Sequence, residues 1–195
     1  DREVIGDASE TALIKFFQPI EDIKEVRSKY HLASQSDNSP ASIPFNSSYK
    51  FALMCYKVED PSSAYSHIVY LKGAPEIIWK RCKYVLHDGK DRPIDREVEK
   101  AFAAANKVYA KNGERVLGFA RMLLPKDKFP HGHGFNFKEP TNPGLPEEFS
   151  FVGLISLIDP PRETVPAAIE KCKTSGIKVI MVTGDQKLTA ASIAK

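Results

Sequence analysis

The sequence contains few cysteines, no long apolar run and no large excess of charge of either sign. Its three cysteines, Cys55, Cys82 and Cys172, are widely spaced, and neither a CxxC pair nor a His/Cys cluster with zinc spacing occurs. These absences argue against a disulfide framework and a zinc site, and they suit a reducing compartment. The longest mostly apolar run, Phe151 to Ile158, is much shorter than the roughly 20 residues that a membrane-spanning helix needs.

The charge balance of the chain is mild. Its 195 residues include 28 basic and 25 acidic residues, and the net charge of +3 is too small to indicate a nucleic-acid binder. With 42% hydrophobic residues, the chain can bury a core as one domain or one and a half. The sequence shows no initiator methionine and no signal peptide, and both ends interrupt patterned sequence. We therefore expect a fragment of a longer protein.

The stretch from Ser66 to Cys82 carries the clearest local signals. Ile68–Leu71 is β-branched and aromatic, which predicts a buried strand, and Pro75 suits the first turn of a helix. Lys72 and Gly73 stand between these two elements. An ammonium group, a bare glycine backbone and a positive helix end together suit a phosphate, so this turn is a candidate phosphate site. The alternative is a simple Lys-Gly turn that binds nothing.

Residues closer to the N-terminus add two candidates. Asp7 is placed to cap a helix that contains Glu10, and Glu10 is either the capping-box partner of Asp7 or free for another role. Phe45 lies in a polar turn before a strand predicted over Tyr49–Val58, with Lys50 near the start of that strand. Phe45 is either anchored in the core or left exposed to stack on a flat ligand. Stacking a base on an aromatic ring contributes about 1–3 kcal/mol.

The middle of the chain predicts a short strand over Tyr84–Leu86 and a long helix over residues 95–112, which ends at an Asn-Gly pair. A strand over Glu114–Leu124 follows. Arg115, at the start of this strand, could bind phosphate oxygens with its forked guanidinium, or it could be a solvated surface charge.

Residues 125–147 are rich in proline and glycine and predict a long surface loop. His131 and His133 lie in this loop without a third metal ligand nearby in the sequence. We interpret both as ordinary surface residues and not as metal ligands.

The architecture changes after this loop. The sequence predicts an apolar strand over Phe149–Ile158, a helix over Thr164–Thr174, a buried strand over Ile177–Val182 and a last helix that begins near Leu188. This alternation is typical of a parallel α/β sheet. Ligands bind such sheets at the carboxyl ends of the strands, where the loop Thr183-Gly184-Asp185 falls. We therefore predict one domain over residues 1–158 and a second over residues 159–195.

A series of short motifs occurs in order along nearly the whole chain. In the first part they are Gly6-Asp7-Ala8-Ser9-Glu10, Ile43-Pro44-Phe45-Asn46-Ser47-Ser48, Lys72-Gly73-Ala74-Pro75-Glu76 and Gly113-Glu114-Arg115-Val116-Leu117-Gly118-Phe119. In the second part they are Phe151-Val152-Gly153-Leu154-Ile155-Ser156, Asp159-Pro160-Pro161-Arg162 and Met181-Val182-Thr183-Gly184-Asp185. Together they resemble the cytoplasmic part of a P-type cation-transporting ATPase, in particular the α-subunits of sodium/potassium and proton/potassium pumps.

The resemblance implies an α/β (α+β) fold in two parts. The first would be a nucleotide-binding domain, an antiparallel sheet flanked by helices. The second would be part of the phosphorylation domain, a parallel α/β segment like that of the haloacid dehalogenases. Asp159 and Arg162 match the hinge between the two domains of the family. Thr183, Gly184 and Asp185 match the loop that meets the transferred phosphoryl group.

The resemblance also implies an ATP site in the first domain. Phe45 would stack on the adenine, Glu10 would bond the amino edge of the base, and Gly73 would let the purine approach the backbone. Lys50 and Lys72 would line the pocket, and Arg115 would bind the phosphates.

The sequence departs from the family at several points. Ala52 stands where the pumps usually carry glutamine, so one polar contact to the base would be lost. The phosphorylated Asp-Lys-Thr-Gly-Thr motif and the Gly-Asp-Gly-x-Asn-Asp motif that places Mg²⁺ do not occur, and Asp127-Lys128 is followed by Phe129-Pro130 and cannot replace the first of them. The resemblance therefore implies a fragment that binds ATP but contains neither the catalytic aspartate nor a metal ligand.

The whole protein, by the same resemblance, would hydrolyse ATP with Mg²⁺ and move cations across the plasma membrane, with this chain on the cytoplasmic side. Its partners would be ATP, the transmembrane and actuator domains of the same chain, and a β-subunit, but no nucleic acid. Two alternatives remain open at this point. A haloacid-dehalogenase-type phosphatase would need an N-terminal Asp-x-Asp nucleophile that does not occur. A non-catalytic interaction module would use its basic residues only as a solvated surface.

Overall fold

The computed structural model describes residues 7–158, 161–183 and 187–194. These residues form two compact units, which are treated separately below. The first unit consists of residues 7–95 and 117–154, and the second of residues 96–116 and 155–194. Segment 96–116 is thus grouped with the C-terminal residues. The division predicted between residues 158 and 159 stays a prediction.

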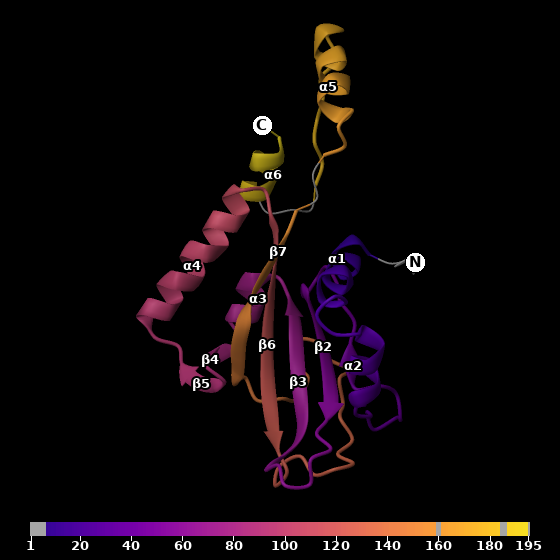
Figure 1. Cartoon of the computed structure of the whole chain (residues 1–195), viewed down its shortest axis with the longest axis vertical. Coiled ribbons are helices and arrows are strands. Elements are labelled where there is room, and N and C mark those ends of the chain that lie inside the picture. Colours follow the sequence, from indigo (N-terminus) through magenta and orange to yellow (C-terminus); the bar gives the residue numbers. More distant parts are fainter. Residues whose placement is uncertain (1–6, 159–160, 184–186, 195) are drawn as a thin grey trace. The chain divides into compact units, whose positions relative to one another are not determined.

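One mixed sheet of seven strands, most of it in the first unit, runs through the described residues (Figure 1). Its strands are β1 (Ser42–Ile43), β2 (Phe51–Lys57), β3 (Tyr65–Gly73), β4 (Cys82–His87), β5 (Lys90–Pro93), β6 (Arg115–Pro125) and β7 (Phe149–Leu157). Their order across the sheet is β1-β2-β3-β6-β7-β4-β5. The predicted antiparallel pairing is present from β1 to β6, whereas β4 and β7 run parallel.

One face of this sheet forms the core of the first unit. Side chains alternate between the two faces of a strand, so Phe51, Leu53 and Cys55 of β2 point to the same face, and each is at most 1% exposed. The short helix α3 (Pro75–Trp79) packs on this face, and its Ile78 is fully buried. Residues of β3 and β6 complete the face: Val69, Leu71, Ala120, Met122 and Leu124.

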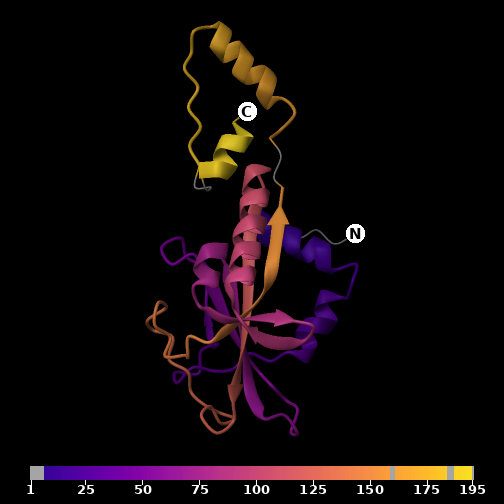
Figure 2. The ribbon, with the colours of Figure 1, turned by 90° about the vertical axis from the view of Figure 1, so that its left-hand side faces the viewer.

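Two helices lie on the other side of the sheet, α1 (Ala8–Phe17) and α2 (Ile23–Lys29) (Figure 2). Asp7 caps α1 as predicted: its carboxylate accepts hydrogen bonds from the backbone N–H groups of Ser9 at 2.9 Å and Glu10 at 3.3 Å. These bonds satisfy donors that a helix leaves free at its start, so the local sequence determines where α1 begins.

The second unit contains the helices α4 (Arg96–Lys111), α5 (Val165–Thr174) and α6 (Lys187–Ile193). The predicted helix ends after α4 and α5 are confirmed. Gly113 and Gly176 have φ angles of 76° and 72°, a left-handed conformation that glycine adopts without the steric penalty of a side chain.

The buried strand predicted over Ile177–Val182 is wrong for this structure. Residues 177–183 belong to no strand, and Ile180 and Val182 are 69% and 91% exposed. A strand is stabilised by hydrogen bonds to a neighbouring strand and by packing on its faces, and residues 177–183 pair with no strand among the described residues. Apolar composition alone therefore does not produce a strand here.

The predicted loop over residues 125–147 contains no helix or strand after β6, but it is not only a surface segment. Phe135 and Phe137 are 2% and 5% exposed, so they are buried within the first unit, to which this loop belongs. The strand β5 was not predicted, because Lys90–Pro93 lacks the alternation of apolar and polar residues that marks a strand. None of the helices in the described residues combines the length and the apolar character that crossing a bilayer requires.

Candidate functional site

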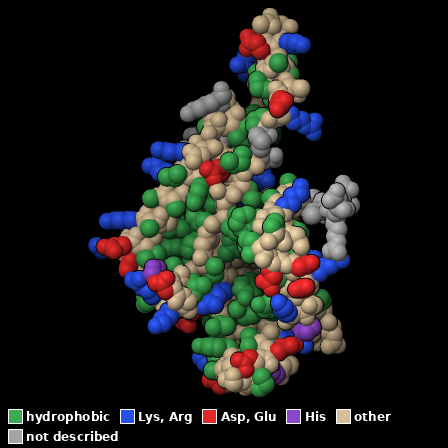
Figure 3. Space-filling view, viewed as in Figure 1, with side chains coloured by type: hydrophobic (Ala, Val, Ile, Leu, Met, Phe, Trp, Pro, Cys, Tyr) green, Lys and Arg blue, Asp and Glu red, His purple; other side chains and the backbone are tan. Residues whose placement is uncertain are grey.

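Lys72 and Gly73 end β3, at the junction with α3. In register, Lys72 lies between Ala52 of β2 and Phe119 of β6, so these three residues share the face opposite the core. The side chain of Lys72 is 26% exposed. Figure 3 shows hydrophobic side chains gathered over the strands on this side of the molecule. The site is therefore an accessible, largely apolar sheet face with an ammonium group at one end.

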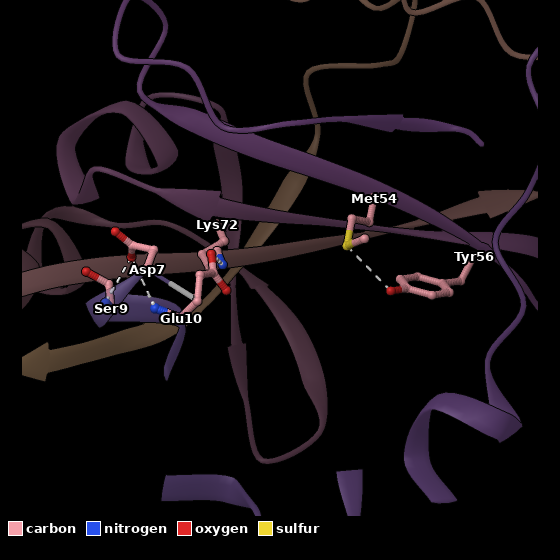
Figure 4. A network of polar contacts seen from close by, with 6 residues as sticks. All are labelled: Asp7, Ser9, Glu10, Met54, Tyr56 and Lys72. Atoms are coloured by element: carbon pink, nitrogen blue, oxygen red, sulfur yellow. Dashed lines mark hydrogen bonds and ion pairs between the residues drawn. The ribbon is translucent and has the colours of Figure 1, made fainter. Parts of the chain in front are cut away.

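Glu10 forms an ion pair with Lys72, 62 positions further along the chain. Figure 4 shows the two side chains meeting beside the capped first turn of α1. The carboxylate of Glu10 is 54% exposed, so water screens the pair and its contribution to stability is small. The pair still sets the position of the Lys72 ammonium group, which is its main consequence for the site. The sequence offered Glu10 as a cap residue or, by resemblance, as a contact to the base, but it did not predict the pair with Lys72.

Gly73 is required by its surroundings. A Cβ atom on this residue would lie 2.3 Å from the carbonyl oxygen of Lys50 and 2.7 Å from the Cα atom of Phe51. Both are backbone atoms and cannot rotate away. Gly73 therefore lets β2 and β3 approach closely directly beneath Lys72, which is a packing role beyond the ligand approach that the resemblance implies.

The turn that carries Phe45 is connected to the same place by hydrogen bonds. The backbone N–H of Lys50 donates to the carbonyl of Asn46 at 2.7 Å, and the carbonyl of Lys50 accepts from Ala74, next to Gly73, at 3.0 Å. Lys50 has a φ angle of 58°, which lets the chain turn sharply into β2. The ring of Phe45 is 60% exposed, so of the two interpretations of Phe45 the exposed one is correct.

A second row of side chains extends the same face beyond Lys72. Met54, Tyr70 and Arg121 are register partners two positions further along β2, β3 and β6. Met54 and Tyr70 are 42% and 40% exposed, and the hydroxyl of Tyr56 donates to the sulfur of Met54 at 3.5 Å (Figure 4). Burial, and then the neighbouring Tyr30, raises the pKa of Tyr70. Sequence reasoning missed this row, although the two-residue period from Ala52 and Lys72 predicts it.

The cytoplasmic domain N of P-type ATPases matches residues 1–164 of this sequence. The chain belongs to the P-type ATPase family. It is 45% identical over 195 residues to potassium-transporting ATPase alpha chain 2 of Oryctolagus cuniculus, and 45% identical over 197 residues to sodium/potassium-transporting ATPase subunit alpha-2 of Rattus norvegicus. Each alignment covers 100% of this chain but 17% and 18% of the relative, so the chain spans about a sixth of the length of these P-type ATPases.

Other residues singled out from the sequence belong to the second compact unit or lie outside the described residues. Arg115 is exposed and begins β6, and it belongs to the second compact unit. Arg162 and Thr183 are also exposed, and the carbonyl of Arg162 accepts from Val165 at 2.9 Å at the start of α5. The remaining residues lie outside the described ones: Asp159, Gly184 and Asp185.

The described residues of the site provide groups that can bind a ligand. It offers an ammonium group, a carboxylate, an exposed ring and a glycine bend, which suit the base and the negative charge of a nucleotide. Within the described part of this P-type ATPase chain, no group of three His, Cys, Asp or Glu residues is arranged to hold a metal ion.

Proposed function

We propose that ATP binds on the sheet face that carries Lys72, and that this chain is the nucleotide-binding module of a P-type ATPase α-subunit. The observation that carries the proposal is the Lys72 ammonium group, held by Glu10 above the glycine bend at the end of β3. The exposed ring of Phe45 stands in a turn that is hydrogen-bonded to the same bend through Lys50. Membership of the N-domain family supports the choice of ATP as the ligand.

The residues have distinct proposed roles in this site. Phe45 stacks on the adenine, because an exposed ring offers its face to a purine without displacing core residues. Glu10 accepts a hydrogen bond from the amino edge of the base and positions Lys72. Gly73 has no side chain, so it lets the purine approach the backbone. Charged residues line the pocket or contact phosphate oxygens: Lys50, Lys72 and Arg115.

For the whole protein we propose the sodium/potassium- or proton/potassium-exchanging activity that the sequence motifs suggest; the relatives are named as potassium-transporting and sodium/potassium-transporting ATPases. ATP, used with Mg²⁺, supplies a γ-phosphoryl group for transfer to an aspartate, and this transfer drives ion transport across the plasma membrane. Thr183, Gly184 and Asp185 would meet the phosphoryl group, and Asp159 and Arg162 would form the hinge. The partners would be the transmembrane and actuator domains of the same chain and a β-subunit.

Replacing Phe45 by alanine tests the base-binding role. Loss of stacking is expected to weaken ATP binding about tenfold or more, because base stacking on an aromatic ring contributes about 1–3 kcal/mol. The affinity is measured by titrating ATP against the backbone resonances of the chain. Phe16→Ala is the matched control, since Phe16 is also 60% exposed but lies at the far end of α1. Equal affinities of the two variants would contradict the stacking role.

Replacing Lys72 by glutamate tests the charge in the site. The new carboxylate would face Glu10 and the phosphates, so we expect ATP affinity to fall at least tenfold, since a hydrogen bond to a charged group contributes about 1.5–3 kcal/mol. Lys29→Glu is the control, because Lys29 also pairs with a glutamate, Glu21, at 3.1 Å but stands on α2. A Lys72→Glu variant that binds ATP as the control does would remove Lys72 from the site. Sulfate that shifts the same resonances as ATP would show a general anion site instead.

A further inference from the structure

His67 is a buried histidine at the end of β3 that lies away from the candidate ATP site. It is 1% exposed and precedes Gly73 by six residues, which corresponds to about 20 Å along a strand. The loop over residues 126–137 covers it, and this loop contains both His131 and His133. His131 is exposed and His133 half-buried, so both lie at the surface as the sequence suggested, and their rings also contact His67 and Phe135.

A chain of hydrogen bonds connects His67 to this loop. The Nδ1 atom of His67 lies 2.9 Å from the hydroxyl oxygen of Ser66. That hydroxyl also contacts the carbonyl of Phe129 in the loop and lies 3.3 Å from the carbonyl of Leu124 in β6. Carbonyl oxygens only accept, so the single hydroxyl proton is donated to one of them. The hydroxyl oxygen then accepts from Nδ1–H of His67, which assigns the neutral tautomer protonated at Nδ1.

Phenylalanine rings fill the space between the histidines. The ring of Phe135, 2% exposed, meets His67 edge-on at 5.1 Å and His133 at 4.8 Å between centroids. His131 lies 6.3 Å from His67, and Phe129 lies 5.1 Å from His133. The buried imidazole of His67 thus packs on an apolar ring, in a place where a positive charge is poorly solvated.

Every charged group that acts on His67 opposes its protonation. Lys57 of β2 is its register partner, and His131 and His133 reach it from the loop, while β6 contributes the uncharged Leu124. Burial first, and then the charges of His131, His133 and Lys57, lower the pKa of His67 to about 4. The pKa of His67 in the docked loop is thus lower than its usual value of about 6.5. The docked loop therefore has its full stability above pH 6.5 and loses stability as the pH falls from there towards 4.

We propose that the buried ring of His67 forms a pH-sensitive latch, which holds the loop over residues 126–137 against the sheet at neutral pH and weakens below about pH 6. A protonated His67 would place a positive charge against the buried ring of Phe135 and beside its register partner Lys57, so the neutral ring is favoured while the loop is docked. Release would also free Ser36, whose N–H donates to the carbonyl of Phe135 at 2.8 Å, and Gln35, which accepts from the N–H of Phe137 at 2.9 Å. This latch does not depend on the proposed ATP binding.

Hydrogen exchange of the Phe135 and Phe137 amides tests the latch in the 195-residue chain. After correction for intrinsic exchange, protection is expected to fall about tenfold or more between about pH 7 and pH 5, since one shifted group changes the opening equilibrium by up to tenfold per pH unit. Fluorescence of Trp79, whose ring packs on Phe151 at 4.9 Å, should stay constant and show that the rest of the unit is folded. Unchanged protection of the two amides would overturn the proposal.

Variants assign the effect to His67. His67→Gln keeps an N–H donor for Ser66 but does not titrate, so the pH effect should shrink to less than threefold. Should this variant fail to fold, His67→Asn decides, because it also carries an N–H donor, does not titrate and must show the same reduction. The control His31→Asn/His87→Asn replaces two histidines that contact Glu59 and Asp88, and it should keep the full effect. A full effect in either latch variant would refute the latch.

Discussion

Gly73→Ala is expected to destabilise the first unit by about 3 kcal/mol or more, among the largest effects of a single methyl group. The added Cβ would stand 2.3 Å from the carbonyl oxygen of Lys50 and 2.9 Å from the Cβ of Phe51. That carbonyl is fixed by its bond to the N–H of Ala74 at 3.0 Å, and Gly73 itself is paired with Phe51 and Gly118 on its two sides. Relief would require β2 and β3 to separate.

Urea unfolding of Gly73→Ala and Gly153→Ala measures this effect against a matched control. Gly153 also lies in a strand, β7, but a Cβ there meets nothing within 4 Å. We expect Gly153→Ala to change the free energy of unfolding by less than about 0.5 kcal/mol. Similar unfolding midpoints for the two variants would show that the close approach of β2 and β3 is not a constraint. Loss of ATP binding by a folded Gly73→Ala variant would connect the bend to the site.

Phe51→Ala is expected to cost about 3–5 kcal/mol, the usual range for removing a fully buried phenylalanine. Phe51 is 0% exposed, its ring lies 5.0 Å from that of Tyr49, and the guanidinium carbon of Arg81 stands 4.6 Å above the ring. Alanine would leave a cavity beside Gly73 and remove the cation–π contact with Arg81. Thermal unfolding of the variant gives the magnitude.

Phe45→Ala serves as the counterpart, because Phe45 is 60% exposed and only six positions away. Its removal should change the unfolding free energy by less than about 0.5 kcal/mol while weakening ATP binding. The two phenylalanines then separate stability from binding. A Phe45→Ala variant as unstable as Phe51→Ala would mean that the Phe45 ring is part of the core, and the proposed stacking role would fail.

Local features of the fold follow directly from short stretches of sequence. The strand before Lys72 and the helix that begins at Pro75 are present as predicted, because β-branched residues, a glycine and a proline act on their own backbone. The same holds for the cap at Asp7 and the helix end at Gly113. These signals depend on neighbours within a few positions, so they hold in almost any tertiary setting.

The sequence by itself determined the family, the presence of strands β2 and β3, and the candidates Lys72, Gly73 and Phe45. Only the tertiary structure decided that Glu10 meets Lys72, that His131 packs on His67, and that Ile177–Val182 forms no strand. The physical reason is the same in each case. A salt bridge, a buried imidazole and a strand all need partners that are distant in sequence, and the choice of partner depends on how the whole chain packs.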